Sequence, residues 1–200
     1  MKRLLCLLCG ACMLLTGCTT AKQQKDYTEA ELPYGATMKC DKSSYAVPMT
    51  WDRRFLDTEA IAKVADYIAS IQNQDGDLYQ ASSLPLYTDY QIQEVYSYKN
   101  TQELVDALHE GLVGKLAEDF KFDMILVNEI SEDRKNSGLA GIIDLLDKIS
   151  NEKKFSDTIQ NAWALQLEWE FSYNNGQGSG RAENQYIYLF QIDNQYYCCM

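Results

Sequence analysis

The sequence predicts an α+β fold in which amphipathic helices pack on an antiparallel sheet. Two observations support this fold class. Residues 163–173 alternate apolar with polar residues, as a strand with one buried face does. Several earlier segments instead repeat apolar residues at spacings of three and four, as helices with one buried face do. Because the helical segments mostly precede the strands, we expect the helices to cover one face of a sheet formed mainly by the C-terminal part of the chain.

The first elements expected along the chain are two short strands, at residues 37–40 and 44–49, joined by a turn. An amphipathic helix follows and extends to about Gln72. It begins after Asp57, a residue type that caps the free N–H groups of a first helical turn. Its apolar residues share one face, which consists of Ile61, Val64, Ala65, Ile68 and Ile71.

A second helix is predicted from residue 101 to about 119. It opens with a capping-box pattern, in which Asn100 is the cap and Glu103 reaches back from the first turn. A mostly apolar run then predicts a strand at residues 122–132. Helical spacing returns at residues 137–149.

Three consecutive antiparallel strands are expected at the C-terminal end. The long strand at 163–173 is followed by a glycine-rich hairpin loop at 174–180 and by a partner strand at 185–192. Asp193-Asn194 is a two-residue turn of the kind that joins antiparallel strands, and it leads to a last strand at 195–199.

This order of elements resembles the nuclear-transport-factor-two-like, or cystatin-like, superfamily over residues 52–199. The likeness rests on an amphipathic helix, an acidic break and further helices before the strands. It also rests on an aromatic strand, a tight turn and a short strand, Tyr186-Ile187-Tyr188-Leu189-Phe190-Gln191-Ile192-Asp193-Asn194-Gln195-Tyr196-Tyr197. The resemblance implies a bent sheet and a cone-shaped pocket between sheet and helices. The helix at 137–149 departs from the simplest version of this fold and is expected to be an insertion.

The first eighteen residues resemble the export signal of bacterial lipoproteins. Lys2 and Arg3 precede an apolar run that is too short to span a membrane, and the run ends in Leu15-Thr16-Gly17-Cys18. That ending is similar to a lipobox, in which the cysteine accepts a diacylglyceryl group before cleavage. The resemblance implies a protein anchored to the membrane through a lipid on Cys18, on the extracytoplasmic face. A secretory leader cut after Gly17 or Ala21, or a core helix, are the competing interpretations.

The predicted organisation is therefore a signal peptide at 1–17, a polar, flexible tether at 18–33, and a single α+β domain at 34–200. This domain is long enough to bury one core. The formal net charge of −11 becomes −13 once Lys2 and Arg3 are removed. Nucleic acid would repel such a chain and is not expected as a partner.

The cysteines divide into a group that lies in the predicted leader, and is lost when the leader is cleaved, and a group that remains in the mature chain. Three lie at metal-ligand spacing in the apolar run, so no metal site is expected from them: Cys6, Cys9 and Cys12. Beyond Cys18, the mature chain keeps Cys40, Cys198 and Cys199. A disulfide from Cys40 to either Cys198 or Cys199 is allowed, although adjacent strand residues point to opposite faces and only one of the two would be within easy reach. The alternative is three buried, unbonded thiols.

No catalytic set is recognised in the chain, and no cofactor is expected. His109 is the single histidine, and it could act as a general base with Asp106 or Glu168 as its acid partner. A structural histidine at the boundary of its helix is the other interpretation. Glu168 and Glu170 share one side of their strand and form a candidate acid pair, or simply a solvated one.

The leading functional hypothesis is a non-catalytic surface lipoprotein that binds a small molecule, a glycan or a protein. Tyrosines concentrate on the last strands, where an aromatic ring with a polar tip suits such ligands. One rival is a small enzyme of the isomerase, dehydratase or hydrolase type that uses the cone pocket. The other is a structural module that forms a homodimer through an open face of its sheet.

Overall fold

The computed structural model describes residues 39–42, 44–132, 137–151 and 153–200. The chain divides into a unit of residues Met1–Ala36 and a compact unit of residues Thr37–Met200. The predicted signal peptide, the predicted tether and Cys18 lie outside the described residues. The compact unit confirms the α+β fold class.

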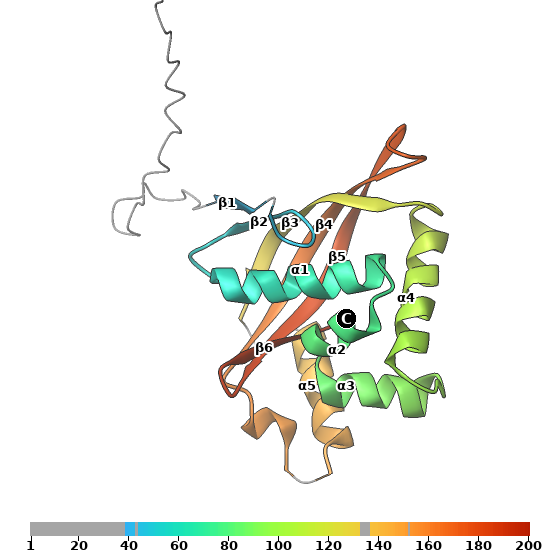
Figure 1. Ribbon diagram of the computed structural model, residues 1–200. Helices are drawn as coiled ribbons and strands as arrows, with labels where there is room; N and C mark the ends of the chain where they lie inside the picture. The colour runs from blue at the N-terminus through green and yellow to red at the C-terminus, as the bar shows by residue number, and fades with distance from the viewer. Residues whose placement is uncertain (1–38, 43, 133–136, 152) are drawn as a thin grey trace, which may run out of the picture. The chain divides into compact units, whose positions relative to one another are not determined.

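The compact unit contains a six-stranded sheet together with helices on both of its faces (Figure 1). The strands lie side by side in chain order, and they are β1 (Lys39–Lys42), β2 (Met49–Asp52), β3 (Lys121–Ser131), β4 (Asn161–Tyr173), β5 (Gly178–Ile192) and β6 (Gln195–Cys199). The helical segments are α1 (Thr58–Gln72), α2 (Gly76–Ser82), α3 (Pro85–Tyr90), the π-helical η2 (Gln91–Val95), α4 (Thr101–Lys115), α5 (Ser137–Ile149) and the 3₁₀-helical η3 (Phe155–Asp157).

The sheet is mixed, so the prediction of a wholly antiparallel sheet was wrong. Strands β3 to β6 are antiparallel to one another, and β1 is antiparallel to β2. However, β2 and β3 are parallel. The helices from α1 to α4 separate these two strands in sequence, and a long helical crossover lets the chain re-enter the sheet in its earlier direction.

The N-terminal strands were predicted too early in the chain. The alternation of buried residues does continue through Val47, Met49 and Trp51, but β2 begins only at Met49. Pro48 has no N–H to give to a ladder, and its carbonyl oxygen instead accepts the N–H of Ile125 at 2.8 Å. The strand therefore follows this proline.

Helices α1 and α4 begin where their caps predicted. Asp57 Oδ1 accepts the N–H of Ala60 at 2.8 Å, and Asn100 Oδ1 accepts the N–H of Glu103 at 3.0 Å. The carboxylate of Glu103 reaches back to the N–H of Lys99, one residue before the cap. Helix α4 ends at Lys115, earlier than the expected residue 119, and Phe120 in the segment that follows is buried.

The core lies on both faces of the sheet, because successive residues of β4, β5 and β6 point in opposite directions. On one face, α1, α2 and α4 cover the larger cluster, which includes Trp51, Tyr67, Phe122, Leu167 and Trp169. On the other face, α5, η3 and the start of α3 cover a smaller cluster, which includes Leu84, Leu139, Leu146, Phe155 and Phe190. The prediction that the helices cover one face was therefore incomplete, since α5 lies on the opposite face.

The two turns predicted between the C-terminal strands are confirmed. Asp193 and Asn194 join β5 to β6, and both have a positive φ, as a two-residue hairpin turn requires. The loop between β4 and β5 contains three consecutive residues with positive φ, Asn174, Asn175 and Gly176. Asp119 holds this loop by accepting the N–H groups of Asn174 and Asn175, at 2.8 and 2.9 Å. These hydrogen bonds lower the pKa of Asp119.

Replacing Asp57 by alanine should cost more stability than the loss of a helix cap alone. Besides capping α1, Asp57 accepts the hydroxyl of Tyr196 on β6 at 2.9 Å, which joins the first helix to the last strand. We expect Asp57→Ala to lower the free energy of unfolding by about 2 kcal/mol. Asn100→Ala removes a cap without such a link and should cost about 1 kcal/mol. Urea unfolding of both variants measures the difference, and equal losses would show that the link to Tyr196 contributes nothing.

Candidate functional site

The space between the helices and the sheet, where the resemblance placed a pocket, is filled with aromatic side chains. Phe122 contacts Phe120 and Trp169 edge-on, with ring centroids 5.2 Å apart in each pair. A void of about 10 Å³ remains, roughly the space of one water molecule. It is lined by Tyr67, Ile68, Ile71, Leu112, Phe122, Trp169, Ile187 and Met200. A ligand larger than water cannot enter this region without unpacking the core.

His109 has a structural contact rather than a catalytic one. Its Nδ1 lies 3.0 Å from the carbonyl oxygen of Ile71, and its ring stacks on Phe120 with centroids 5.4 Å apart. Since a carbonyl can only accept, Nδ1 carries the proton in this contact and donates it. His109 thus links α4 to the end of α1.

The two carboxylates considered as partners of His109 are engaged elsewhere. Asp106 accepts the side-chain amide of Gln102 at 2.8 Å. Glu168 points away from the helices α1 and α4, to the other face of the sheet, where it pairs with Arg181. The structure therefore does not bring together the histidine and the acid that a general-base mechanism would need.

Glu168 and Glu170 do share one side of β4, as the alternation predicted. Arg181 of the neighbouring strand bridges them, with nitrogen–oxygen distances of 2.7 Å to Glu168 and 2.6 Å to Glu170. Asn128 of β3 donates to the second oxygen of Glu168 at 3.2 Å. The hydrogen bond to Glu170 and the charge of Glu168 raise the pKa of Arg181. The two carboxylates therefore belong to an ion-pair network that is centred on Arg181.

Cys198 and Cys199 are buried free thiols on opposite faces of β6, one in each hydrophobic cluster. Burial raises the pKa of both thiols, which keeps them protonated and unreactive. The backbone of Cys40 belongs to β1, at the other edge of the sheet from β6. The disulfide that the sequence allowed is thus not formed in this structure, because the sheet order separates its members.

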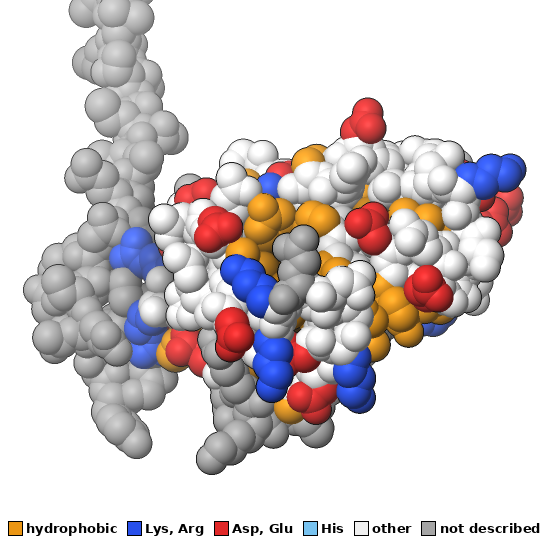
Figure 2. Space-filling view, turned by 90° about the horizontal axis from the view of Figure 1, so that it is seen from below, with side chains coloured by type: hydrophobic (Ala, Val, Ile, Leu, Met, Phe, Trp, Pro, Cys, Tyr) orange, Lys and Arg blue, Asp and Glu red, His pale blue; other side chains and the backbone are white. Residues whose placement is uncertain are grey.

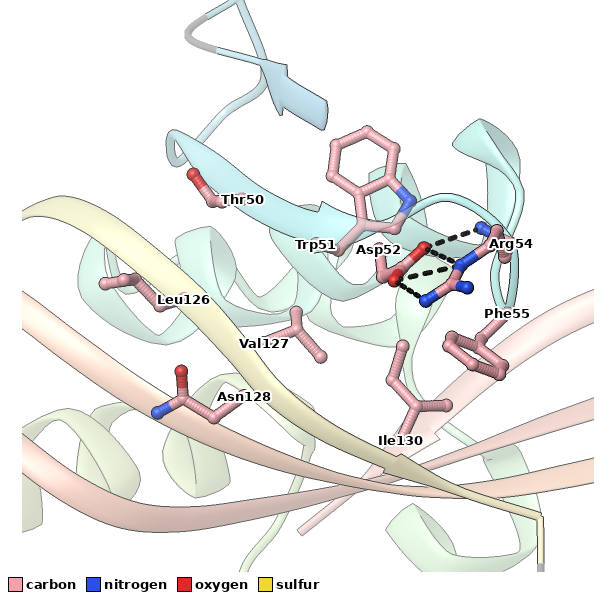
Figure 3. Close-up of a pocket in the computed structure, with 9 residues that line it drawn as sticks. All are labelled: Thr50, Trp51, Asp52, Arg54, Phe55, Leu126, Val127, Asn128 and Ile130. Atoms are coloured by element: carbon pink, nitrogen blue, oxygen red, sulfur yellow. Dashed lines mark hydrogen bonds and ion pairs between the residues drawn. The ribbon is translucent and has the colours of Figure 1, made fainter. Parts of the chain in front are cut away.

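The candidate site is instead a cleft of about 230 Å³ between β2 and β3 (Figure 3). The two strands pair only where Met49 and Thr50 lie beside Ile125 and Leu126, and the cleft borders the end of this short ladder. It is lined by Thr50, Trp51, Asp52, Arg54, Phe55, Leu126, Val127, Asn128 and Ile130.

A tight turn after β2 builds one wall of the cleft. Asp52 accepts the backbone N–H of Arg54 at 3.1 Å and also pairs with the Arg54 guanidinium, with a nitrogen–oxygen distance of 2.7 Å. The guanidinium carbon lies 5.2 Å from the centroid of the Phe55 ring, within the range of a cation–π contact. The indole N–H of Trp51 fixes the end of the turn by donating to the carbonyl of Leu56 at 2.9 Å.

Apolar side chains of β3 form the opposite wall. Val127 and Ile130 extend into the space below the Asp52–Arg54 pair, and Ile130 faces Phe55 (Figure 3). The ring of Phe55 is half exposed, so an apolar surface borders the cleft on this side as well. The cleft therefore joins an apolar surface to a charged, hydrogen-bonded rim. Sequence reasoning missed it, because the meeting of residues 50–55 with 126–130 depends on a parallel pairing that no local pattern indicates.

A second, more open groove lies between η2 and the end of α5. Its lining is mixed and includes two carboxylates: Leu86, Asp89, Tyr90, Gln93, Glu94, Ile149 and Asn151. Seen from the end of the domain that α5 occupies, hydrophobic side chains appear between charges of both signs (Figure 2). Within the described part of the chain, no group of three His, Cys, Asp or Glu side chains is placed to hold a metal ion.

Comparisons with protein-family models, with curated proteins and with solved structures found no match to this chain. A search of the described helices found none long and apolar enough to cross a membrane.

Alkaline conditions should unfold the domain between about pH 10 and 12. Burial raises the pKa of Tyr87 to about 12, and burial together with the bond to Asp57 raises the pKa of Tyr196 to about 12. These phenols bind their protons more tightly in the folded protein than in the unfolded chain. Their contribution to the free energy of unfolding is therefore complete below the ordinary tyrosine pKa of about 10, and it is lost as the pH rises toward 12. Tyrosinate absorbance and circular dichroism followed together measure this. Ionisation of every tyrosine near pH 10 without loss of structure would contradict it.

Proposed function

We propose that the protein is an extracytoplasmic lipoprotein, anchored to the membrane through Cys18, whose domain binds a partner without catalysing a reaction. The address rests on Leu15-Thr16-Gly17-Cys18 and on the apolar run before it. The binding role rests on one observation above all: the interior is filled, whereas an amphipathic cleft opens on the surface beside the half-exposed Phe55.

The fold that we propose is a variant of the cystatin-like arrangement. Its support is α1 lying across the antiparallel strands β3 to β6, which corresponds to the helix and sheet of that superfamily. The departures are the β1–β2 hairpin, the parallel pairing of β2 with β3, and α5 on the opposite face. In this variant aromatic side chains occupy the cone, so a ligand has to bind elsewhere.

Two observations weigh against the rival functions. An enzyme using the cone would need space beside His109, but that ring is stacked and hydrogen-bonded. A homodimer through the open sheet face would bury the network of Glu168, Glu170 and Arg181, and buried ion pairs are costly to desolvate. The cleft offers free space, and its apolar wall can be covered without burying this network.

Site-specific photo-cross-linking in the producing cell tests the binding role. A photoreactive phenylalanine analogue at Phe55 should form a discrete adduct with another macromolecule. The same analogue at Val95 should not, because Val95 is similarly exposed but lies away from the cleft. No adduct at Phe55, or the same adducts from both positions, would contradict partner binding at the cleft.

A further inference from the structure

The cleft exposes one unpaired edge of a long strand. β3 pairs with β4 along its whole length, from Lys121 to Ser131. On its other side it pairs with β2 only at Ile125 and Leu126. Residues 127–130 of β3 therefore have no neighbouring strand on that side among the residues that the structure describes.

Specific backbone groups face this open side. Ile125 donates its N–H toward β2, and the alternation of a strand turns the backbone of Val127 the same way. The pairing with β4 shifts register between Val127 and Glu129, and this bulge brings Ile130 to the open side in place of Glu129. The carbonyl of Val127 and both the N–H and the carbonyl of Ile130 are thus left for a partner. Such a row of donors and acceptors is complementary to an extended polypeptide backbone.

The side chains beside the edge define what kind of segment would fit. Toward the helices, the apolar surface of Val127, Ile130 and Phe55 would receive aliphatic side chains. The opposite, solvated face is acidic, because Glu129 is exposed and Arg181 neutralises only one of the two carboxylates it bridges. Side chains on that face of an added strand would therefore be favoured if they were basic.

We propose that the edge of β3 at residues 127–130 accepts an extended segment of a partner protein as an additional strand, in which aliphatic residues alternate with lysine or arginine. This inference rests on the proposed function and specifies the partner by its chemistry. The aliphatic residues contact Phe55 and Ile130, and the basic residues lie over Glu129. Backbone hydrogen bonds to Val127 and Ile130 fix the register.

Amide NMR of the chain from residue 19 onward, titrated with three synthetic peptides, tests this proposal. The first is a nine-residue peptide that alternates lysine with valine or threonine. The second has the same sequence with alternate backbone nitrogens methylated, and the third has glutamate in place of lysine. The first should shift the Ile130 amide and slow its hydrogen exchange. Methylation and the change to glutamate should each weaken binding at least about tenfold, since they remove the backbone donors and reverse the charge.

Two matched variants locate the effect. Glu129→Lys should weaken binding of the lysine peptide severalfold, whereas Glu94→Lys, an exposed glutamate at the other groove, should not. Equal binding of the methylated peptide, equal effects of the two variants, or no response of the β3 amides would overturn the proposal. A dimer mass in light scattering that is lost in the Glu129→Lys variant would mean that a second copy of this chain covers the edge, and it would also overturn the proposal. If one of these results were obtained together with a cross-linked adduct from Phe55, partner binding at the cleft would still be supported. Only the proposal that the partner adds a strand to β3 would be rejected.

Discussion

Replacing Trp169 by alanine is expected to lower the free energy of unfolding by about 3–5 kcal/mol, the loss typical of a buried aromatic side chain. Trp169 is 3% exposed and packs edge-on against Phe122 in the region that would otherwise be the pocket of the cone. Its removal should open a cavity lined by apolar groups. Small apolar molecules such as benzene should then bind to the variant and raise its melting temperature, without effect on the parent protein.

Two control variants test whether the loss of stability comes from emptying the cone or from removing any aromatic ring. Trp169→Phe keeps most of the volume and should cost no more than about 2 kcal/mol. The indole N–H of Trp169 has no hydrogen-bond partner among the described residues, so no such bond is lost. Tyr186→Ala removes a half-exposed ring of the solvated face and should change stability by less than about 0.5 kcal/mol. Benzene binding to the unaltered protein would mean that the cone is open after all.

Replacing Cys18 by serine should release most of the protein from the membrane fraction. A serine hydroxyl does not replace the thiol that accepts the lipid, and the domain offers an acidic, poorly membrane-binding surface in its place. We expect the variant to be recovered without lipid, outside the membrane fraction. Fractionation of the producing cells and detection of the domain in each fraction measure the change.

Cys12→Ser is the matched control for this experiment. It changes a cysteine of the same leader that is expected to be removed with it, so anchoring should be unaffected. If Cys18→Ser and the unaltered protein divide identically between the fractions, the lipid anchor is absent. If both variants disappear from the membrane fraction, the loss of anchoring is due to a damaged leader and not to the missing lipid.

The sequence predicted those elements whose signals are local. Asp57 and Asn100 mark helix starts because a cap acts on N–H groups only two or three residues away. The long alternation in β4 and the Asp193-Asn194 turn are similarly local, and both are confirmed. The placement of α5 was not predicted. Its apolar residues indicate that one face of the helix is buried, but they do not indicate which side of the sheet that face packs against.

The candidate site could not be predicted for the same physical reason. The cleft depends on β2 joining β3 in parallel across the intervening helices, and on a bulge that turns Ile130 toward it. The Asp52-Arg53-Arg54-Phe55 stretch carries the only local signal, an arginine beside an aromatic residue that the structure leaves half exposed. The opposite error concerned the cone: a fold resemblance implied a pocket, whereas the size of Trp169 and Phe122 fills it.

The mass of the N-terminal peptide, measured on the protein extracted from its own host, tests the central claim most directly. A membrane-anchored lipoprotein should yield a peptide that begins at Cys18 and carries a diacylglyceryl group on its sulfur. A peptide that begins at Met1, or one that begins elsewhere without lipid, would contradict the anchored, extracytoplasmic role.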